Sequence, residues 1–332
     1  ANLLLLGLYG IANHWITGSS KVLWVTTTYA QYAGRASGSY FCPDHFSGLM
    51  ELLLALALGL VLANRTGEAT GTDTRHAWLR RAAAGLMVVV SLYGVWLSQS
   101  RGGGLTVIAI LSLALLMWTA RFRPAIRWGV RFGALGAGVV ALCVLWNSGS
   151  PYIARFRELL PVDRAPGSEA GETDTAKGSP IKDNIRYNMY SAAFRAWREV
   201  DPLFGIGPGM HQHLWFHYAA SPDSDRARGI WPSRPNHSTH SHQVHNDWLQ
   251  LLEEYGIVGA VVFTLFVCAL AVLLVRGLAS DAPPHTVIGG ILCLATMALH
   301  SLVDFNLQMP ATAWIFACIL AIPFTWIQRS DS

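Results

Sequence analysis

The sequence predicts an all-α polytopic membrane protein with about eight transmembrane helices in this chain. Of its 332 residues, 52% are hydrophobic and 13% are charged, about half of the ~25% that is usual in a soluble domain. The apolar residues gather into runs that approach the ~20 residues a helix needs to cross a bilayer. These features exclude a disordered tail, an ordinary soluble enzyme and a basic domain that would bind nucleic acid.

The apolar runs, taken in order, predict the eight spans. They are Ala1–Ala12, Phe46–Ala63, Ala82–Leu97, Leu105–Ala120, Phe132–Trp146, Ile257–Val275, Thr286–Val303 and Ala311–Ile327. Because the chain begins inside an apolar run, we expect an N-terminally incomplete bundle. Residues 1–146 then hold the N-terminal transmembrane helices, and residues 248–332 hold the C-terminal ones.

Arginines in the short loops predict the orientation. Arg80 and Arg81 precede the third span, and Arg127 and Arg131 follow the fourth. If every span crosses once, these arginines share one side of the membrane, which is the cytoplasm. Residues 147–247 then form one large loop domain on the opposite side.

Residues 188–200 of this loop carry apolar side chains at helical spacing. The pattern predicts an amphipathic helix that ends at Asp201–Pro202 and could lie on the membrane surface. Gly205–Gly209 follows; without a subsequent Lys-Ser/Thr it is no phosphate-binding P-loop, and it predicts a rigid turn.

The loop histidines allow two interpretations. His240, His242 and His245, with three histidines upstream, could suggest zinc. We expect no metal, because a His-Glu-x-x-His motif is absent and the ligands would come from two distant segments. His245 directly precedes Asn246–Asp247, a helix N-cap pair. There it is either a base that takes a proton near pH 7 or a polar residue that merely caps the helix.

Several arginines are candidate anion ligands. Arg101 lies in the Gly-rich turn Ser98–Gly104 between two spans, where an arginine is costly unless an anion or carboxylate meets it. Open glycine N–H groups would favour an anion there, and we prefer this interpretation to a snorkelling arginine. Arg186 precedes the amphipathic helix, and Arg195 and Arg198 lie on it. Two such arginines could hold a diphosphate without a metal, although a solvated helix face is the alternative.

Two acids lie within or at the edge of spans. An intramembrane acid is commonly functional, but it can also pair with an arginine or a helix end and fix the bundle. For Asp304, one helical turn after His300, we favour the structural role. For Glu51 both roles stay open.

Five segments in order resemble the O-antigen ligase/polymerase family of bacterial inner-membrane glycosyltransferases. Residues 38–48 are similar to its Gly-Thr-Phe…Asn-His-Phe-Ala-Gly segment, 100–103 to its Ser-Arg-Gly turn, 186–209 to the helix and Gly-x-Gly-x-Gly stretch of its periplasmic loop, 245–259 to its His-Asn…Glu-x-Gly signature, and 301–305 to its closing motif. Asp44 stands where the family usually has Asn, which adds a negative charge near an anionic donor.

The resemblance implies transfer of a glycan from a polyprenyl-diphosphate carrier to a lipid or glycan acceptor. The reaction would take place on the periplasmic face of the inner membrane, without a metal or other cofactor. His245 would be the base on the acceptor hydroxyl, Arg101 and Arg186 would hold the donor diphosphate, and a single displacement would invert the anomeric centre. We expect five supporting residues: Asn246, Glu254, His45, Glu51 and Arg195.

Other activities stay open. The family also contains polysaccharide polymerases and protein O-oligosaccharyltransferases, which differ in an acceptor that this sequence does not reveal. A transporter or a structural subunit of a membrane complex is the alternative from another class. A transporter should have paired discontinuous helices and midplane charges, whereas the ionisable residues here gather at one face and in one loop, which favours interfacial chemistry.

Overall fold

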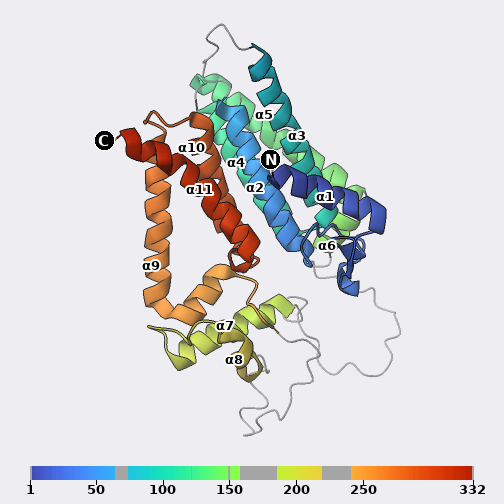
Figure 1. Cartoon of the computed structure of the whole chain (residues 1–332), viewed down its shortest axis with the longest axis vertical. Coiled ribbons are helices and arrows are strands. Elements are labelled where there is room, and N and C mark those ends of the chain that lie inside the picture. The colour runs from blue at the N-terminus through green and yellow to red at the C-terminus, as the bar shows by residue number, and fades with distance from the viewer. Residues whose placement is uncertain are drawn as a thin grey trace. The chain divides into compact units, whose positions relative to one another are not determined.

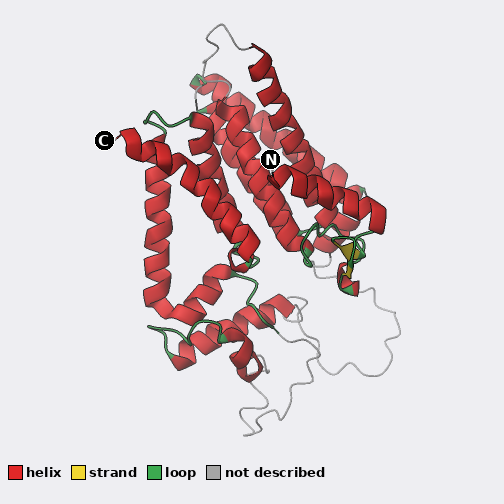
Figure 2. Cartoon of the chain, in the orientation of Figure 1, coloured by secondary structure: helices red, strands yellow, loops and turns green. Residues whose placement is uncertain are grey.

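The computed structural model describes residues 2–63, 74–120, 122–148, 150–157, 185–218 and 241–330, most of which are helical (Figure 2). The chain forms two compact units. The first comprises Ala1–Ile153, Val267–Ser301 and Asn306–Ser332, and the second comprises Ala154–Phe266 and Leu302–Phe305. Much of the predicted loop domain, residues 158–184 and 219–240, lies outside the described residues.

The first unit contains most of the long helices (Figure 1). Its elements are α1 (Asn2–Thr17), β1 (Lys21–Val22), β2 (Thr26–Thr27), η1 (Ala30–Tyr32), α2 (Pro43–Ala63), α3 (Thr74–Ser98), α4 (Arg101–Thr119), α5 (Pro124–Asn147), α10 (Pro284–His300), η2 (Asn306–Gln308) and α11 (Pro310–Ser330). The short helix α6 (Pro151–Arg157) crosses the boundary between the units.

The centre of the first unit is α2, which packs mainly against α10 and α3. Most of its side chains are buried, including Leu49, Leu52 and Leu53. Gly59 allows a close helix contact, because a Cβ there would lie 2.7 Å from backbone atoms of Gly289 on α10. Such small residues are typical of helix interfaces in membranes, where packing rather than water exclusion drives association.

Five described helices are long and apolar enough to cross a membrane: α2, α3 from Trp78, α4, α5 and α9 (Asp247–Gly277). They correspond to five of the eight predicted spans. The other three predictions fall on shorter apolar helical segments, namely α1 with 16 residues, α10 (Pro284–His300) and the part of α11 over Pro310–Trp326. The count of eight spans is therefore not confirmed, whereas a mostly helical chain with several helices able to cross a membrane is.

The predicted span Thr286–Val303 extends too far. Helix α10 ends at His300, and residues 301–305 form a turn. Asp304 therefore does not continue the helical face of His300, and the expectation that it lies one helical turn further along a span is wrong. Apolar residues 302 and 303 made the two segments look continuous in the sequence.

The second unit contains α7 (Ile185–Val200) and α8 (His211–Tyr218). The amphipathic helix predicted over residues 188–200 is confirmed as α7, including its end before Asp201–Pro202. It begins three residues earlier than predicted, at Ile185, so Arg186 lies on the helix and does not precede it. Its apolar face packs against α8, where Met189 and Ala192 contact Trp215. After the helix, the Asp201 carboxylate accepts hydrogen bonds from two backbone N–H groups, 2.9 and 3.1 Å away, and fixes a turn.

Helix α9 is interrupted at Gly256, whose φ of 63° is left-handed. The chain at residues 202–207 bridges the break: Ile206 and Gly207 donate N–H groups to the carbonyls of residues 253 and 254, and the N–H groups of residues 257 and 258 donate to the carbonyls of 202 and 203. A Cβ on Gly256 would lie 2.2 Å from the carbonyl oxygen of residue 203. A Cβ on Gly205 would lie 2.5 Å from the carbonyl carbon of residue 254. Both glycines are therefore required, and the backbone groups freed by the break are paired.

Candidate functional site

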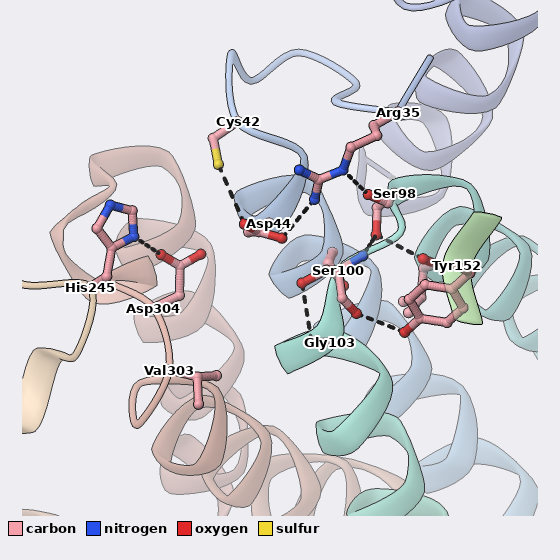
Figure 3. Close-up of polar contacts among 12 residues, drawn as sticks. Arg35, Cys42, Asp44, Ser98, Ser100, Gly103, Tyr152, His245, Val303 and Asp304 are labelled. Atoms are coloured by element: carbon pink, nitrogen blue, oxygen red, sulfur yellow. Dashed lines mark hydrogen bonds and ion pairs between the residues drawn. The ribbon is translucent and has the colours of Figure 1, made fainter. Parts of the chain in front are cut away.

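His245 lies just before α9, in a left-handed conformation with φ 59°. Its Nδ1 is 3.0 Å from Oδ1 of Asp304 (Figure 3). Because an ionised carboxylate only accepts hydrogen bonds, Nδ1 donates to Asp304, and in the neutral form of the ring Nε2 keeps its lone pair. The His245 side chain is 25% exposed and that of Asp304 only 1%, so a buried acid orients a partly accessible imidazole. This is the tautomer that a general base requires.

Tyr190 and Phe305 hold His245 from two further directions. The Tyr190 hydroxyl on α7 donates to the carbonyl of His245 at 2.8 Å. The Phe305 ring meets the imidazole edge-on at 4.6 Å between centroids. Burial raises the pKa of Tyr190, with Arg186 lowering it and Asp304 raising it to smaller extents, so this hydroxyl stays a donor at neutral pH. A left-handed non-glycine residue costs about 1–2 kcal/mol, and these contacts offset that cost.

The N-cap predicted from the sequence is present. The Asn246 side chain accepts a hydrogen bond from the Leu249 N–H at 2.9 Å, at the start of α9. Glu254, two residues before the break at Gly256, accepts from the Gln250 amide at 3.0 Å. Asn246 therefore fixes the backbone next to His245, and Glu254 helps to hold the side chain of Gln250.

Arg186 lies beside the same turn as Asp304. Its guanidinium donates to the carbonyl of Val303 at 2.7 Å. The second unit thus brings together two predicted site residues, Arg186 and His245, that are 59 positions apart in the sequence. Arg195 has a different position, because it donates to the carbonyl of Tyr218 and so ties α7 to the last residue of α8.

Arg101 belongs to the first unit and is the first residue of α4. The side chain of Ser100 caps this helix by accepting from the Gly103 N–H at 3.2 Å, and the Ser100 carbonyl accepts from the Gly104 N–H. The expectation that these glycine N–H groups are open to an anion is therefore wrong for Gly103 and Gly104. The Tyr152 hydroxyl adds a 2.7 Å hydrogen bond to the same carbonyl (Figure 3).

Close packing explains the glycines of this turn. A Cβ on Gly103 would lie 1.9 Å from the Ser47 hydroxyl oxygen, and one on Gly104 would lie 2.0 Å from that of Tyr152. No larger side chain fits without moving α2 or α6. The motif Ser-Arg-Gly-Gly thus places Arg101 at the start of a helix that packs tightly against its neighbours.

Glu51 pairs with His300 in the interior of the first unit. The two carboxylate oxygens lie 2.9 and 2.8 Å from Nδ1 of His300, and the Ser47 hydroxyl donates to Glu51 at 2.9 Å. Both members of the pair are 1% exposed. The geometry supports the structural role for Glu51, with a histidine rather than an arginine as partner, because the pair joins the two most closely packed helices.

His45 is also buried in the first unit, at the start of α2. Its ring lies edge-on to Tyr40 at 6.1 Å, and the Tyr40 hydroxyl is hydrogen-bonded to Thr312.

Among the described residues, no group of three or more His, Cys, Asp and Glu side chains could hold a metal ion. His240, which the zinc interpretation included, lies outside the described residues.

Sequence reasoning missed two members of the cluster around His245. Asp304 stood out as an acid at the edge of a span, but its assignment to a helical face obscured its partner. Tyr190 carried no signal, because a tyrosine on an amphipathic helix is an ordinary packing residue. The described cluster therefore consists of His245, Asp304, Tyr190 and Arg186.

Comparison with known families adds an independent observation. The sequence model of the family described as O-antigen ligase matches residues 86–264, more than half of the chain. No curated protein matches the chain. The matched segment includes Arg101, Arg186 and His245 and ends before Asp304.

Proposed function

The chain belongs to the O-antigen ligase family, and we propose that it transfers a glycan from a polyprenyl-diphosphate carrier to an acceptor hydroxyl. The reaction takes place on the periplasmic face of the bacterial inner membrane. The observation that carries the proposal is the 3.0 Å contact between His245 Nδ1 and Asp304. It leaves Nε2 as a proton acceptor on a partly exposed ring.

In the proposed reaction, Nε2 of His245 removes the proton from the acceptor hydroxyl. The hydroxyl oxygen forms a bond to the anomeric carbon of the donor sugar as the bond from that carbon to the diphosphate oxygen breaks. A single displacement of this kind inverts the anomeric centre. Asp304 stabilises the imidazolium that forms, since its carboxylate faces the protonated Nδ1.

Arg186 and Arg101 bind the donor diphosphate in this proposal. Negative charge on the diphosphate grows as it leaves, so a guanidinium stabilises the transition state more than the ground state. The contact between Arg186 and the carbonyl of Val303 supports its assignment, because it anchors the cation next to the residue that orients His245. Arg101 is assigned by its family motif and its position at the start of α4.

The test measures polyprenyl diphosphate released from a lipid-linked glycan by the full chain. A general base contributes about 10²–10⁴-fold, so His245→Ala should lower turnover by that factor. His213→Ala is the matched control, because His213 is an exposed histidine of the same unit. Equal turnover by the His245 variant and the wild type would refute the proposal.

The arginines have their own control. Arg186→Ala removes a charge-assisted bond of about 1.5–3 kcal/mol, which corresponds to about a 10- to 160-fold loss in kcat/KM. Arg198 lies on the same helix and is exposed, so Arg198→Ala should keep the wild-type value. Equal losses in both variants would indicate a general effect of charge on α7 instead of donor binding.

The acceptor distinguishes the family's activities. Turnover with a lipid acceptor indicates a ligase, turnover with a second lipid-linked glycan a polymerase, and turnover with a polypeptide a protein O-oligosaccharyltransferase. Addition of a chelator tests whether the reaction needs a metal. Failure of all acceptors would favour the transporter or structural alternative. Transporters also use interrupted helices such as α9. Here the backbone groups freed by the break pair with residues 202–207, which favours a helix break that is fixed in position.

A further inference from the structure

A second histidine–acid pair lies in the unit that contains His245. Nδ1 of His211, the first residue of α8, is 2.8 Å from Oε2 of Glu253 on α9. Nε2 of His211 is 3.1 Å from the hydroxyl oxygen of Ser241. The three residues are 1–2% exposed. None of them belongs to the cluster that performs the proposed reaction.

The order Ser–His–acid resembles a nucleophilic triad, but the hydrogen bonds run in the opposite direction. The Ser241 hydroxyl donates to the carbonyl of Gln243 at 2.8 Å, and a hydroxyl has one proton to donate. Ser241 must therefore accept from Nε2–H of His211, while Nδ1 of His211 and the carboxyl group of Glu253 share one further proton in the hydrogen bond between them. An imidazole that donates to the serine cannot remove its proton, so Ser241 is not an activated nucleophile.

The network instead fixes the segment 241–245, which ends at His245. Ser241 is held by His211 and in turn holds the carbonyl of Gln243. The next residue, Val244, donates its N–H to the side-chain oxygen of Gln250 at 3.0 Å. The Gln250 amide also donates to the side chain of Gln243. The segment is thus attached to α8 and α9 immediately before the left-handed residue His245.

We infer that His211 and Glu253, acting through Ser241, are positioning residues for the proposed reaction. They keep segment 241–245 in the conformation that presents Nε2 of His245 to the acceptor. Glu253 orients His211, His211 anchors Ser241, and Ser241 fixes the backbone two residues before His245. A displacement of about 1 Å at a reacting group can cost about 100-fold in rate. Loss of the hydrogen bonds that hold the segment before His245 should therefore lower turnover. The inference rests on the proposed function of His245.

The test compares kcat and the KM for the lipid-linked donor in full-chain variants. His211→Ala and Glu253→Ala should each lower kcat by about 10- to 100-fold. The KM should change by less than about threefold, because the arginines that bind the donor are held by other contacts. The double variant should lose no more than either single variant, since both residues act through one network.

Glu253→Gln is the conservative variant. Its amide can donate to Nδ1 of His211, which leaves Nε2–H to donate to Ser241, so kcat should return to within about threefold of wild type. Leu292→Ala is the stability control: Leu292 is fully buried in the first unit, and its loss should lower the melting temperature without lowering kcat of the folded protein. Equal kcat losses in Leu292→Ala and His211→Ala would overturn the positioning role.

Ser241→Ala removes only one hydroxyl group, so it tests the positioning role even if His211→Ala and Glu253→Ala do not fold. It should lower kcat by about three- to tenfold, and an unchanged kcat would overturn the inference. His245→Ala separates the two proposals. Active His245→Ala protein refutes the proposed function itself, whereas an inactive His245→Ala beside fully active His211→Ala and Ser241→Ala refutes the positioning role alone.

Discussion

Replacement of Asp304 by asparagine tests the chemistry of the His245 site most directly. The carboxylate is 1% exposed and 3.0 Å from Nδ1 of His245. When His245 takes a proton, this hydrogen bond joins two opposite charges, whereas an asparagine side chain carries no negative charge. A hydrogen bond to a charged group contributes about 1.5–3 kcal/mol. At ~1.36 kcal/mol for each tenfold change, Asp304→Asn should lower kcat about 10- to 160-fold.

The assay is release of polyprenyl diphosphate at saturating donor and acceptor, with the melting temperature measured on the same samples. Asparagine has the shape of aspartate and can still hydrogen-bond to the imidazole, so the fold should persist. Asp201→Asn makes the same chemical change in a turn where the amide oxygen can replace the carboxylate, and it should keep wild-type turnover. An Asp304→Asn protein with wild-type kcat would refute the assignment of Asp304 as the partner of a base.

Three further predictions concern backbone geometry, the support of His245 and the interior of the first unit. Gly256→Ala should lower the melting temperature and turnover together, because its Cβ would overlap the bridging chain at the break of α9; an unchanged thermal transition would contradict the bridge. Tyr190→Phe deletes a hydrogen bond to the carbonyl of His245 that contributes about 0.5–1.5 kcal/mol, so kcat should fall about 2- to 12-fold, and equal kcat would exclude this support. Glu51→Leu leaves His300 buried without its acid and should destabilise the fold by about 3–5 kcal/mol. The double replacement of Glu51 and His300 by leucine should recover much of that lost stability, as measured by thermal unfolding. A Glu51→Leu protein as stable as the wild type would exclude a structural pair.

The sequence predicted the helical class and the five helices that are long and apolar enough to cross a membrane, because long apolar runs have few other structures available to them in a bilayer. It also located α7 and the cap of α9, because both depend on residues close together in the chain. The ends of short apolar helices were harder. The turn at residues 301–305 is apolar enough to pass for helix, so the position of Asp304 depended on tertiary structure.

The residues of the candidate site could likewise be predicted only where the evidence for them lies close together in the sequence. The sequence indicated His245 and Arg186, because each has a recognisable local context. It could not pair His245 with Asp304 or Glu51 with His300, since the partners are 59 and 249 positions apart. Folding of the chain decides such pairings, and hydropathy does not distinguish an acid that orients a base from one that joins two helices.

Asp44 illustrates how a departure from a family pattern can be absorbed locally. Its carboxylate lies 2.9 Å from the guanidinium of Arg35, and both side chains are about a tenth exposed. A buried charge is costly without a partner, so the acid at this position and the arginine nine residues before it stabilise each other. Arg35 also donates to the carbonyl of Ser98 at the end of α3 (Figure 3). The extra negative charge is therefore neutralised where it arises, and the ion pair attaches the loop before α2 to the turn that leads into Arg101.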